Sequence, residues 1–132
     1  MIVIDTSALM PIVLDEPTAP ACIATIEMHD ELLVSAGTMA ECLIVATRRN
    51  VLAEMTQIFD GVGFDVVAVT PAMALHVAAA YGRWGKGIHV AGLNFGDCFA
   101  YELAVQRSCP LLYVGDDFAG TDVLSAISMA SP

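Results

Sequence analysis

Five acidic residues lie where an apolar stretch of this sequence gives way to a turn or to the start of a predicted helix. Asp5 and the pair Asp116-Asp117 each follow an apolar stretch. Glu41 and Asp97 fall in the first turns of predicted helices. In a parallel sheet, strand ends and helix starts of this kind share one edge, where open α/β sheets gather their ligands. We therefore expect these carboxylates to converge at that edge.

Carboxylates gathered in one place need a cation or a change in protonation. Two of them about 4 Å apart repel by roughly 4 kcal/mol at an effective dielectric of about 20, so several cannot all stay ionised unaided. A set of oxygen ligands selects Mg²⁺ or Mn²⁺ over Zn²⁺. Such an ion binds phosphate oxygens and activates water for in-line displacement. The acids thus predict hydrolysis of a phosphodiester.

Each acid taken singly also has an ordinary structural explanation. Asp5 or Ser7 can cap the helix that follows. The segment Thr38–Glu41 fits the capping-box pattern, and Asn94–Asp97 resembles one. Asp116-Asp117 can be turn residues. The metal-site hypothesis depends on all of these positions occurring together.

The elements that must position these acids alternate along the chain. Alternation of strands and helices predicts an α/β fold with a parallel sheet, right-handed crossovers and helices on both faces. At 132 residues, the chain is predicted to be one domain over residues 1–132. The predicted strands cover 1–4, 31–35, 64–69 and 111–114. The predicted helices cover 8–14, 18–29, 38–49, 51–59, 71–81 and 94–107, and a glycine-rich loop covers 82–93.

Composition limits the classes of function. Fifteen acids against five bases give a net charge of −10, which is poor for a nucleic-acid binder but suits a divalent cation or a basic partner. No apolar stretch is long enough to span a bilayer, and no secretory signal precedes Asp5. Four widely spaced cysteines show no zinc-ligand spacing and are expected to be reduced. We expect a soluble cytoplasmic protein with no membrane partner.

Three runs carry a resemblance to a known family. They are Met1–Ala8, Leu93–Tyr101 and Gly115–Phe118, with Glu41 between the first two and Thr121-Asp122 after the last. With these runs in this order, the chain resembles PIN-domain proteins, and more closely the VapC-type toxin ribonucleases of bacterial toxin–antitoxin pairs. The resemblance covers essentially the whole chain. It implies a three-layer α/β/α fold, Mg²⁺- or Mn²⁺-dependent endoribonuclease activity on RNA, a homodimer and inhibition by a cognate antitoxin.

The resemblance also assigns roles to individual residues. Asp5, Glu41 and Asp97 match the acidic metal-site positions. Asp116 and Asp117 are both candidates for the fourth acid, because the length of this turn varies within the family. Two hydroxyl residues match positions that hold or orient the first aspartate and its water: Thr6 and Ser7.

The basic residues are the candidates for RNA contact. Arg83, Lys86 and Arg48 are expected to contact phosphates, with Arg49 as a further candidate. In the glycine-rich loop, Ile88 and Val90 stand where similar sequences often have Arg and Pro. We therefore expect weaker binding of RNA, while these replacements leave the metal site unaffected.

A second hypothesis belongs to a different class of function. The chain would be a PIN-fold binding module that docks a partner protein and cleaves RNA weakly or not at all. The low content of basic residues favours this alternative, and the intact set of acids opposes it. Dependence of cleavage on Mg²⁺ or Mn²⁺ separates the two hypotheses.

Overall fold

The computed structural model describes residues 1–127. Strands and helices alternate, as the sequence predicts. The elements are β1 (Ile2–Ile4), α1 (Thr6–Leu14), α2 (Ala19–Glu27), β2 (Leu32–Ser35), α3 (Ala36–Arg48), α4 (Leu52–Gly61), β3 (Asp65–Val67), α5 (Pro71–Trp84), α6 (Phe95–Arg107), β4 (Leu111–Leu112) and a short 3₁₀ helix, η1 (Phe118–Gly120).

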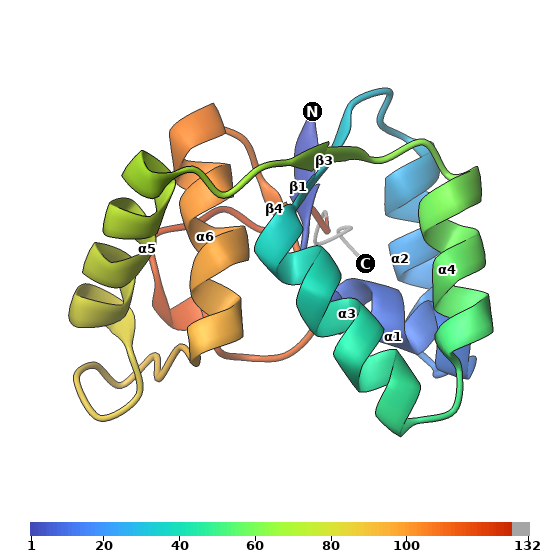
Figure 1. The fold of residues 1–132 in the computed structure, drawn as a ribbon, viewed down its shortest axis with the longest axis horizontal. Helices are drawn as coiled ribbons and strands as arrows, with labels where there is room; N and C mark the ends of the chain where they lie inside the picture. The colour runs from blue at the N-terminus through green and yellow to red at the C-terminus, as the bar shows by residue number, and fades with distance from the viewer. Residues whose placement is uncertain (128–132) are drawn as a thin grey trace, which may run out of the picture.

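The four strands form one parallel sheet in the order β3-β2-β1-β4 (Figure 1). Val3 of β1 lies opposite Leu33 of β2 on one side and opposite Leu111 of β4 on the other. The chain therefore leaves β1 in one direction through β2 and β3, and returns to its other side at β4. This change of direction is a topological switch point, and it places the carboxyl ends of β1 and β4 side by side.

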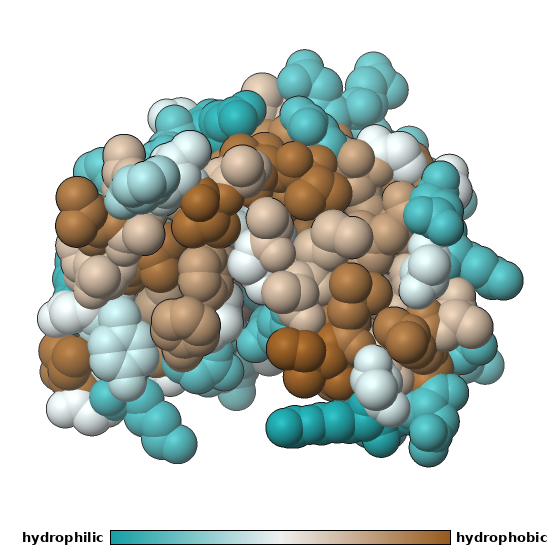
Figure 2. All heavy atoms as spheres, in the orientation of Figure 1, coloured by the Kyte–Doolittle hydropathy of each residue, from teal (hydrophilic) through white to brown (hydrophobic). Residues whose placement is uncertain are grey.

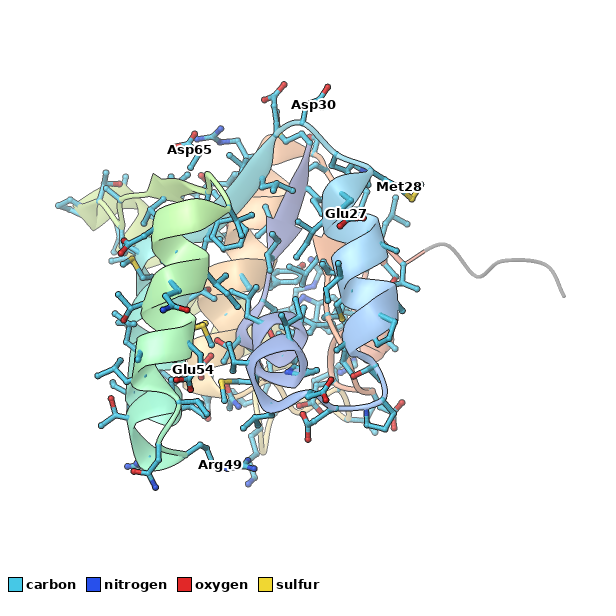
Figure 3. All side chains as sticks on the ribbon, turned by 90° about the vertical axis from the view of Figure 1, so that its right-hand side faces the viewer. Glu27, Met28, Asp30, Arg49, Glu54 and Asp65 are labelled. Carbon is cyan, nitrogen blue, oxygen red and sulfur yellow. The ribbon has the colours of Figure 1, made fainter. Side chains whose placement is uncertain are left out.

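Helices cover both faces of the sheet and complete three layers. Val3 and Leu111 pack into a core cluster with the residues of α5 and α6. Their strand neighbours Ile4 and Leu112 point to the opposite face, into a cluster with α1–α4. Figure 3 shows α1, α2 and α4 in front of the sheet. The alternation is the period of two expected of strands, and it confirms the predicted three-layer α/β/α fold.

Helix caps explain where the observed bounds differ from the predicted ones. Helix α1 begins at Thr6, two residues early, because Asp5 is its N-cap. Helix α3 begins at Ala36 and not at Thr38, because Ser35 accepts a hydrogen bond from the Gly37 amide at 3.2 Å. Strands β3 and β4 are shorter than predicted.

The helix before the glycine-rich loop is longer than predicted. It continues three residues past Tyr81 and ends when the Gly85 amide donates to the Tyr81 carbonyl at 2.8 Å. A Cβ atom at position 85 would collide with that carbonyl, so the turn requires glycine. Arg83 therefore belongs to the last turn of α5 and not to the loop.

Two further sequence expectations concern the chain as a whole. All four cysteines are free thiols. Within residues 1–127 no single helix is long and apolar enough to cross a membrane, although α1 and α2, bent by 117° at their junction, reach that length and composition together.

Candidate active site

Asp5 lies at the carboxyl end of β1 and is only 2% exposed. Its Oδ2 atom accepts a hydrogen bond from the Ser7 amide at 3.0 Å, which caps α1. Its Oδ1 atom is buried and has no hydrogen-bond partner among the described residues. The pKa of Asp5 is raised to about 7, chiefly by burial and also by the charges of Asp97 and Glu41, against the opposing effect of the hydrogen bonds from Ser7. One oxygen is therefore structural, and the other is a free acceptor.

Glu41 is held by a hydroxyl group from the neighbouring helix. Thr6 Oγ1 donates to Glu41 Oε1 at 2.5 Å and accepts from the Cys42 thiol at 3.5 Å. The capping-box explanation for Thr38 and Glu41 is wrong, because Ser35 caps α3 one turn earlier. Glu41 instead faces the start of α1, where Asp5 lies.

Gly96 lets the first turn of α6 approach this glutamate. A Cβ atom at position 96 would collide with Glu41 Oε2. Gly37 has the matching role on α3, since a Cβ atom there would lie 2.5 Å from the Phe99 ring. Sequence reasoning missed both contacts. The available signal was Gly96 in the first turn of the predicted helix 94–107, where a glycine costs roughly 0.5–1 kcal/mol relative to alanine unless a contact requires it.

Asp97 combines a capping role with a place in the site. Its amide donates to Asn94 Oδ1 at 2.8 Å, and its own Oδ2 accepts from the Asn94 amide at 3.0 Å, which completes a capping box. Burial raises the pKa of Asp97 to about 6, and the charges of Asp117 and Glu41 add to this effect against the Asn94 hydrogen bond. The predicted capping box is confirmed, and the same carboxylate interacts with the other acids.

The two remaining acids lie on the loop that follows β4. Asp116 and Asp117 are both exposed, and Gly115 just before them has φ of +104°. The loop is joined to α1 because the Val114 amide donates to Ser7 Oγ at 3.0 Å. Asp117, and not Asp116, is among the charges that raise the pKa of Asp97. Of the two, Asp117 is therefore the charge that acts on Asp97.

These carboxylates influence one another but do not form a closed shell of ligands. In the part of the chain that the structure describes, no three His, Cys, Asp or Glu side chains are grouped closely enough to hold a metal ion as they stand. A divalent cation nevertheless fits the chemistry here. Asp5 Oδ1 is a buried acceptor without a donor, and such groups normally have a partner. The surrounding groups are carboxylate oxygens, the ligands that Mg²⁺ and Mn²⁺ prefer.

The predicted RNA-contact residues are not gathered in one place. Arg48 lines a groove of about 330 Å³ together with Glu41 and Gly96. Arg83 stacks on the Trp84 ring, with its Cζ 4.5 Å from the ring centroid. Lys86 is exposed on the glycine-rich loop. Arg48 therefore shares a groove with a site acid, Glu41.

Arg49 lies beyond the end of α3 in the turn before α4. In Figure 3 it is at the lower end of the molecule, opposite Asp30 and Asp65 at the upper end. The N-terminal end of α6 also lies at the lower edge, where Figure 2 shows the surface hollowed. The positive charge of Arg49 is therefore at the same end of the molecule as the acids.

The comparison with known proteins agrees with this geometry. A family model described as the PIN domain matches residues 2–124. The chain belongs to the PIN-domain family. Ribonuclease VapC30 of Mycobacterium tuberculosis is 40% identical over 124 residues, which cover 92% of this chain and 95% of the relative. Ribonuclease VapC28 of the same organism is 39% identical over 129 residues, with coverage of 95% and 97%.

Solved structures give the same fold for this PIN domain. The crystal structure of Mycobacterium tuberculosis VapC20, described as a toxin that cleaves the sarcin–ricin loop, aligns with a TM-score of 0.78 at 14% identity, over 94% of this chain and 97% of that one. A chain from a toxin–antitoxin complex of Klebsiella pneumoniae aligns with a TM-score of 0.68 at 16% identity, with coverage of 92% and 93%. The resemblance to VapC-type PIN proteins is confirmed.

Proposed function

We propose that this PIN-domain protein is the toxin of a toxin–antitoxin pair and an endoribonuclease that requires Mg²⁺ or Mn²⁺. The observation that carries the proposal is the free, buried Oδ1 of Asp5 at the switch point of the sheet, with Glu41 and Asp97 close enough to raise its pKa. The identity of about 40% to proteins named VapC ribonucleases supports the reaction class.

The chain's own groups would fix the carboxylates before substrate arrives. Asp5 and Asp97 would hold the cation, with Glu41 and one of Asp116 and Asp117 binding directly or through water. When bound, the ion supplies Lewis-acid activation of water and neutralises charge on the phosphate. Thr6 orients Glu41, Ser7 orients Asp5 and Asn94 orients Asp97. Such locked side chains favour a productive geometry.

The reaction that fits this arrangement is hydrolysis by in-line attack. Water attacks the phosphorus, the bond to the 3′ oxygen breaks, and the leaving oxygen takes up a proton. The products are a 5′-phosphate and a 3′-hydroxyl. Arg48 lies in the groove beside Glu41 and is placed to contact a phosphate of the same strand. The small number of bases predicts weak, salt-sensitive binding of RNA.

Metal removal tests the proposal. Single-stranded RNA is incubated with the protein in EDTA, and then with Mg²⁺ or Mn²⁺ added back in excess. We expect no cleavage in chelator and restored cleavage with either ion. Full cleavage by protein confirmed to be metal-free would refute the proposal. Absence of cleavage under every condition would favour the alternative of a PIN-fold binding module.

The antitoxin is proposed to use the same carboxylates as the cation. An Arg or Lys side chain inserted among Asp5, Glu41 and Asp97 would form charge-assisted hydrogen bonds there. Inhibition would then compete with metal and weaken with added salt. Titration of Mn²⁺ with and without the toxin-binding segment of the antitoxin measures this competition.

The cytoplasm is the proposed location, and the free thiols fit a reducing compartment.

A second copy of the chain is the proposed partner of the apolar face shown in Figure 2. A groove of about 470 Å³ runs between α5 and α6 and contains no charged residue. It shares Phe95 and Phe99 with the Arg48 groove, and Phe95 is 72% exposed. Two chains of charge −10 repel, and a contact surface with little charge keeps that repulsion small. This face meets that condition.

A further inference from the structure

The loop that carries Asp116 and Asp117 is not fixed by the aspartates themselves. Neither side chain takes part in a hydrogen bond or salt bridge with another residue in the range 1–127. Both are exposed. Their position relative to Asp97 must therefore come from the way the rest of the loop is held by its neighbours.

The first attachment is on α1. The Val114 amide, just after β4, donates to Ser7 Oγ at 3.0 Å. The Ser7 amide also donates to Asp5 Oδ2, the N-cap of α1. One residue thus joins the start of the loop to the aspartate at the end of β1.

The second attachment is on α6 and centres on one buried hydroxyl group. Tyr101 is 3% exposed, and its hydroxyl donates to Asp122 Oδ1 at 2.6 Å. The Tyr101 hydroxyl oxygen also accepts a hydrogen bond from Trp84 Nε1 at 2.9 Å. The other carboxylate oxygen of Asp122 lies 3.7 Å from Arg83 Nη2. A single phenol therefore links α5, α6 and the far end of the loop.

Between the two attachments lies the 3₁₀ helix η1, which packs against the core. Phe118 is 2% exposed and packs against Tyr113, with ring centroids 5.2 Å apart. Gly120 lies against the glycine-rich loop, where a Cβ atom would be 3.0 Å from Ala91 Cβ. Asp117 is the residue just before this short helix, so a shift of the helix after loss of the far attachment would move Asp117 with it.

We propose that Tyr101 and Asp122 are positioning residues that clamp the far end of this loop and thereby hold Asp117 opposite Asp97. This inference rests on the proposed nuclease function and adds two residues that touch neither RNA nor cation. Burial, with the hydrogen bond to Asp122, raises the pKa of Tyr101 to about 12, so the hydroxyl keeps its proton at neutral pH. The clamp is therefore permanent in the physiological pH range.

The test compares three variants with the wild-type protein. Tyr101→Phe keeps the ring and removes both hydrogen bonds of the hydroxyl. Asp122→Ala removes the loop's acceptor and leaves the contact between Trp84 and Tyr101 intact. Asp122→Asn keeps an acceptor for the hydroxyl and is the conservative rescue. Glu102→Gln, the next residue on α6, is the matched control.

Two readouts separate positioning from general stability. Calorimetric titration gives the affinity for Mn²⁺, and hydrogen exchange reports opening at the amides of 115–120. We expect Tyr101→Phe and Asp122→Ala to weaken Mn²⁺ binding and cleavage by about tenfold or more, the usual effect of losing a group that orients a ligand. Exchange should rise in 115–120 but not in α1. Asp122→Asn and Glu102→Gln should resemble wild type.

The outcomes distinguish this inference from the proposed function. Folded Asp122→Ala protein with wild-type Mn²⁺ affinity and wild-type exchange in 115–120 would overturn the clamp, and this variant decides the matter if Tyr101→Phe does not fold. If the wild-type protein shows no metal-dependent cleavage, the proposed function fails. Hydrogen exchange then still decides whether Tyr101 and Asp122 hold the loop.

Discussion

At the scale of single residues, Asp5 and Asp97 each cap a helix and also belong to the candidate site. Asp5 caps α1 with one oxygen and leaves the other buried and free. Asp97 completes the capping box of α6 while interacting with Glu41 and Asp117. A helix cap fixes a carboxylate at a strand end or helix start, which is also the edge where ligands bind. Capping and function are therefore compatible explanations of the same residue.

The raised pKa values predict how the stability of the metal-free protein depends on pH. Asp5 titrates at about 7 and Asp97 at about 6 in the folded state, against an ordinary value of 3.8. Between these values the folded state holds protons that the unfolded state has lost, so the unfolding free energy falls as pH rises from the ordinary value of 3.8 to the folded values of about 6 and about 7. Each unit of pKa is worth about 1.4 kcal/mol, which gives a loss of a few kcal/mol.

Urea unfolding at about pH 5 and about pH 8 measures this loss. The midpoint should be lower at the higher pH in EDTA. Asp5→Asn keeps a good cap residue and removes the charge, so its midpoint should change less with pH. A wild-type midpoint that rises with pH, or an Asp5→Asn protein with the same drop as wild type, would contradict the assignment of the buried charge.

Gly96→Ala tests the close approach of α6 to Glu41. The added methyl group would collide with Glu41 Oε2, so the glutamate or the helix must move. We expect a loss of stability of about 1–3 kcal/mol and a large loss of cleavage. Gly82→Ala is the matched control, because its Cβ meets nothing within 4 Å in helix α5. That change should leave cleavage intact and stabilise by roughly 0.5–1 kcal/mol.

At the scale of elements, the sequence predicted the strands and helices, which depend on local patterns, and missed contacts between residues far apart in the chain. The strand before Asp5 and the helix starting after Asn94 follow from apolar runs and cap chemistry, and both are observed. The start of α3 was misplaced because two cap candidates, Ser35 and Thr38, lie three residues apart. The tether of Tyr101 to Asp122 spans 21 positions and leaves no local pattern.

The capping box of α6 gives a prediction at this scale. Asn94→Ala removes the acceptor for the Asp97 amide and should cost about 1 kcal/mol of unfolding free energy. It should also free the Asp97 side chain and lower cleavage. Thr70→Ala is the control, because Thr70 caps α5 in the same way through the Met73 amide. We expect the two variants to lose similar amounts of stability, and only Asn94→Ala to lose cleavage. Equal cleavage by both variants would show that the cap does not position Asp97.

At the scale of the whole molecule, topology and charge together define the site. The strand order β3-β2-β1-β4 brings residues 5 and 117 to one edge although they are far apart in the sequence. That these residues share one edge follows from the alternation of strands and helices, which predicts a parallel sheet. The net charge of −10 makes that edge suited to cations and leaves few places where another acidic chain can approach.

The proposed dimer face is tested by introducing a positive charge at either of two neighbouring alanines of α5. Ala78 lines the apolar groove, whereas its neighbour Ala79 lies on the other side of α5 beside His76 and Arg83. Ala78→Arg should convert a dimer to a monomer in light scattering at micromolar concentration. Ala79→Arg should leave the dimer intact. A wild-type monomer, or an Ala78→Arg protein that still dimerises, would exclude this face.

The most direct measurement of the central claim is the RNA cleavage rate of Asp97→Asn in Mn²⁺, beside Asp60→Asn on the exposed surface of α4. Asparagine preserves an acceptor for the Asn94 amide, so the helix should stay capped and only the charge is lost. A metal site supplies several kcal/mol of transition-state stabilisation, so we expect the rate to fall about a hundredfold or more. Asp60→Asn should cleave at the wild-type rate. Wild-type cleavage by folded Asp97→Asn would show that the carboxylates at this edge of the sheet are not the catalytic centre.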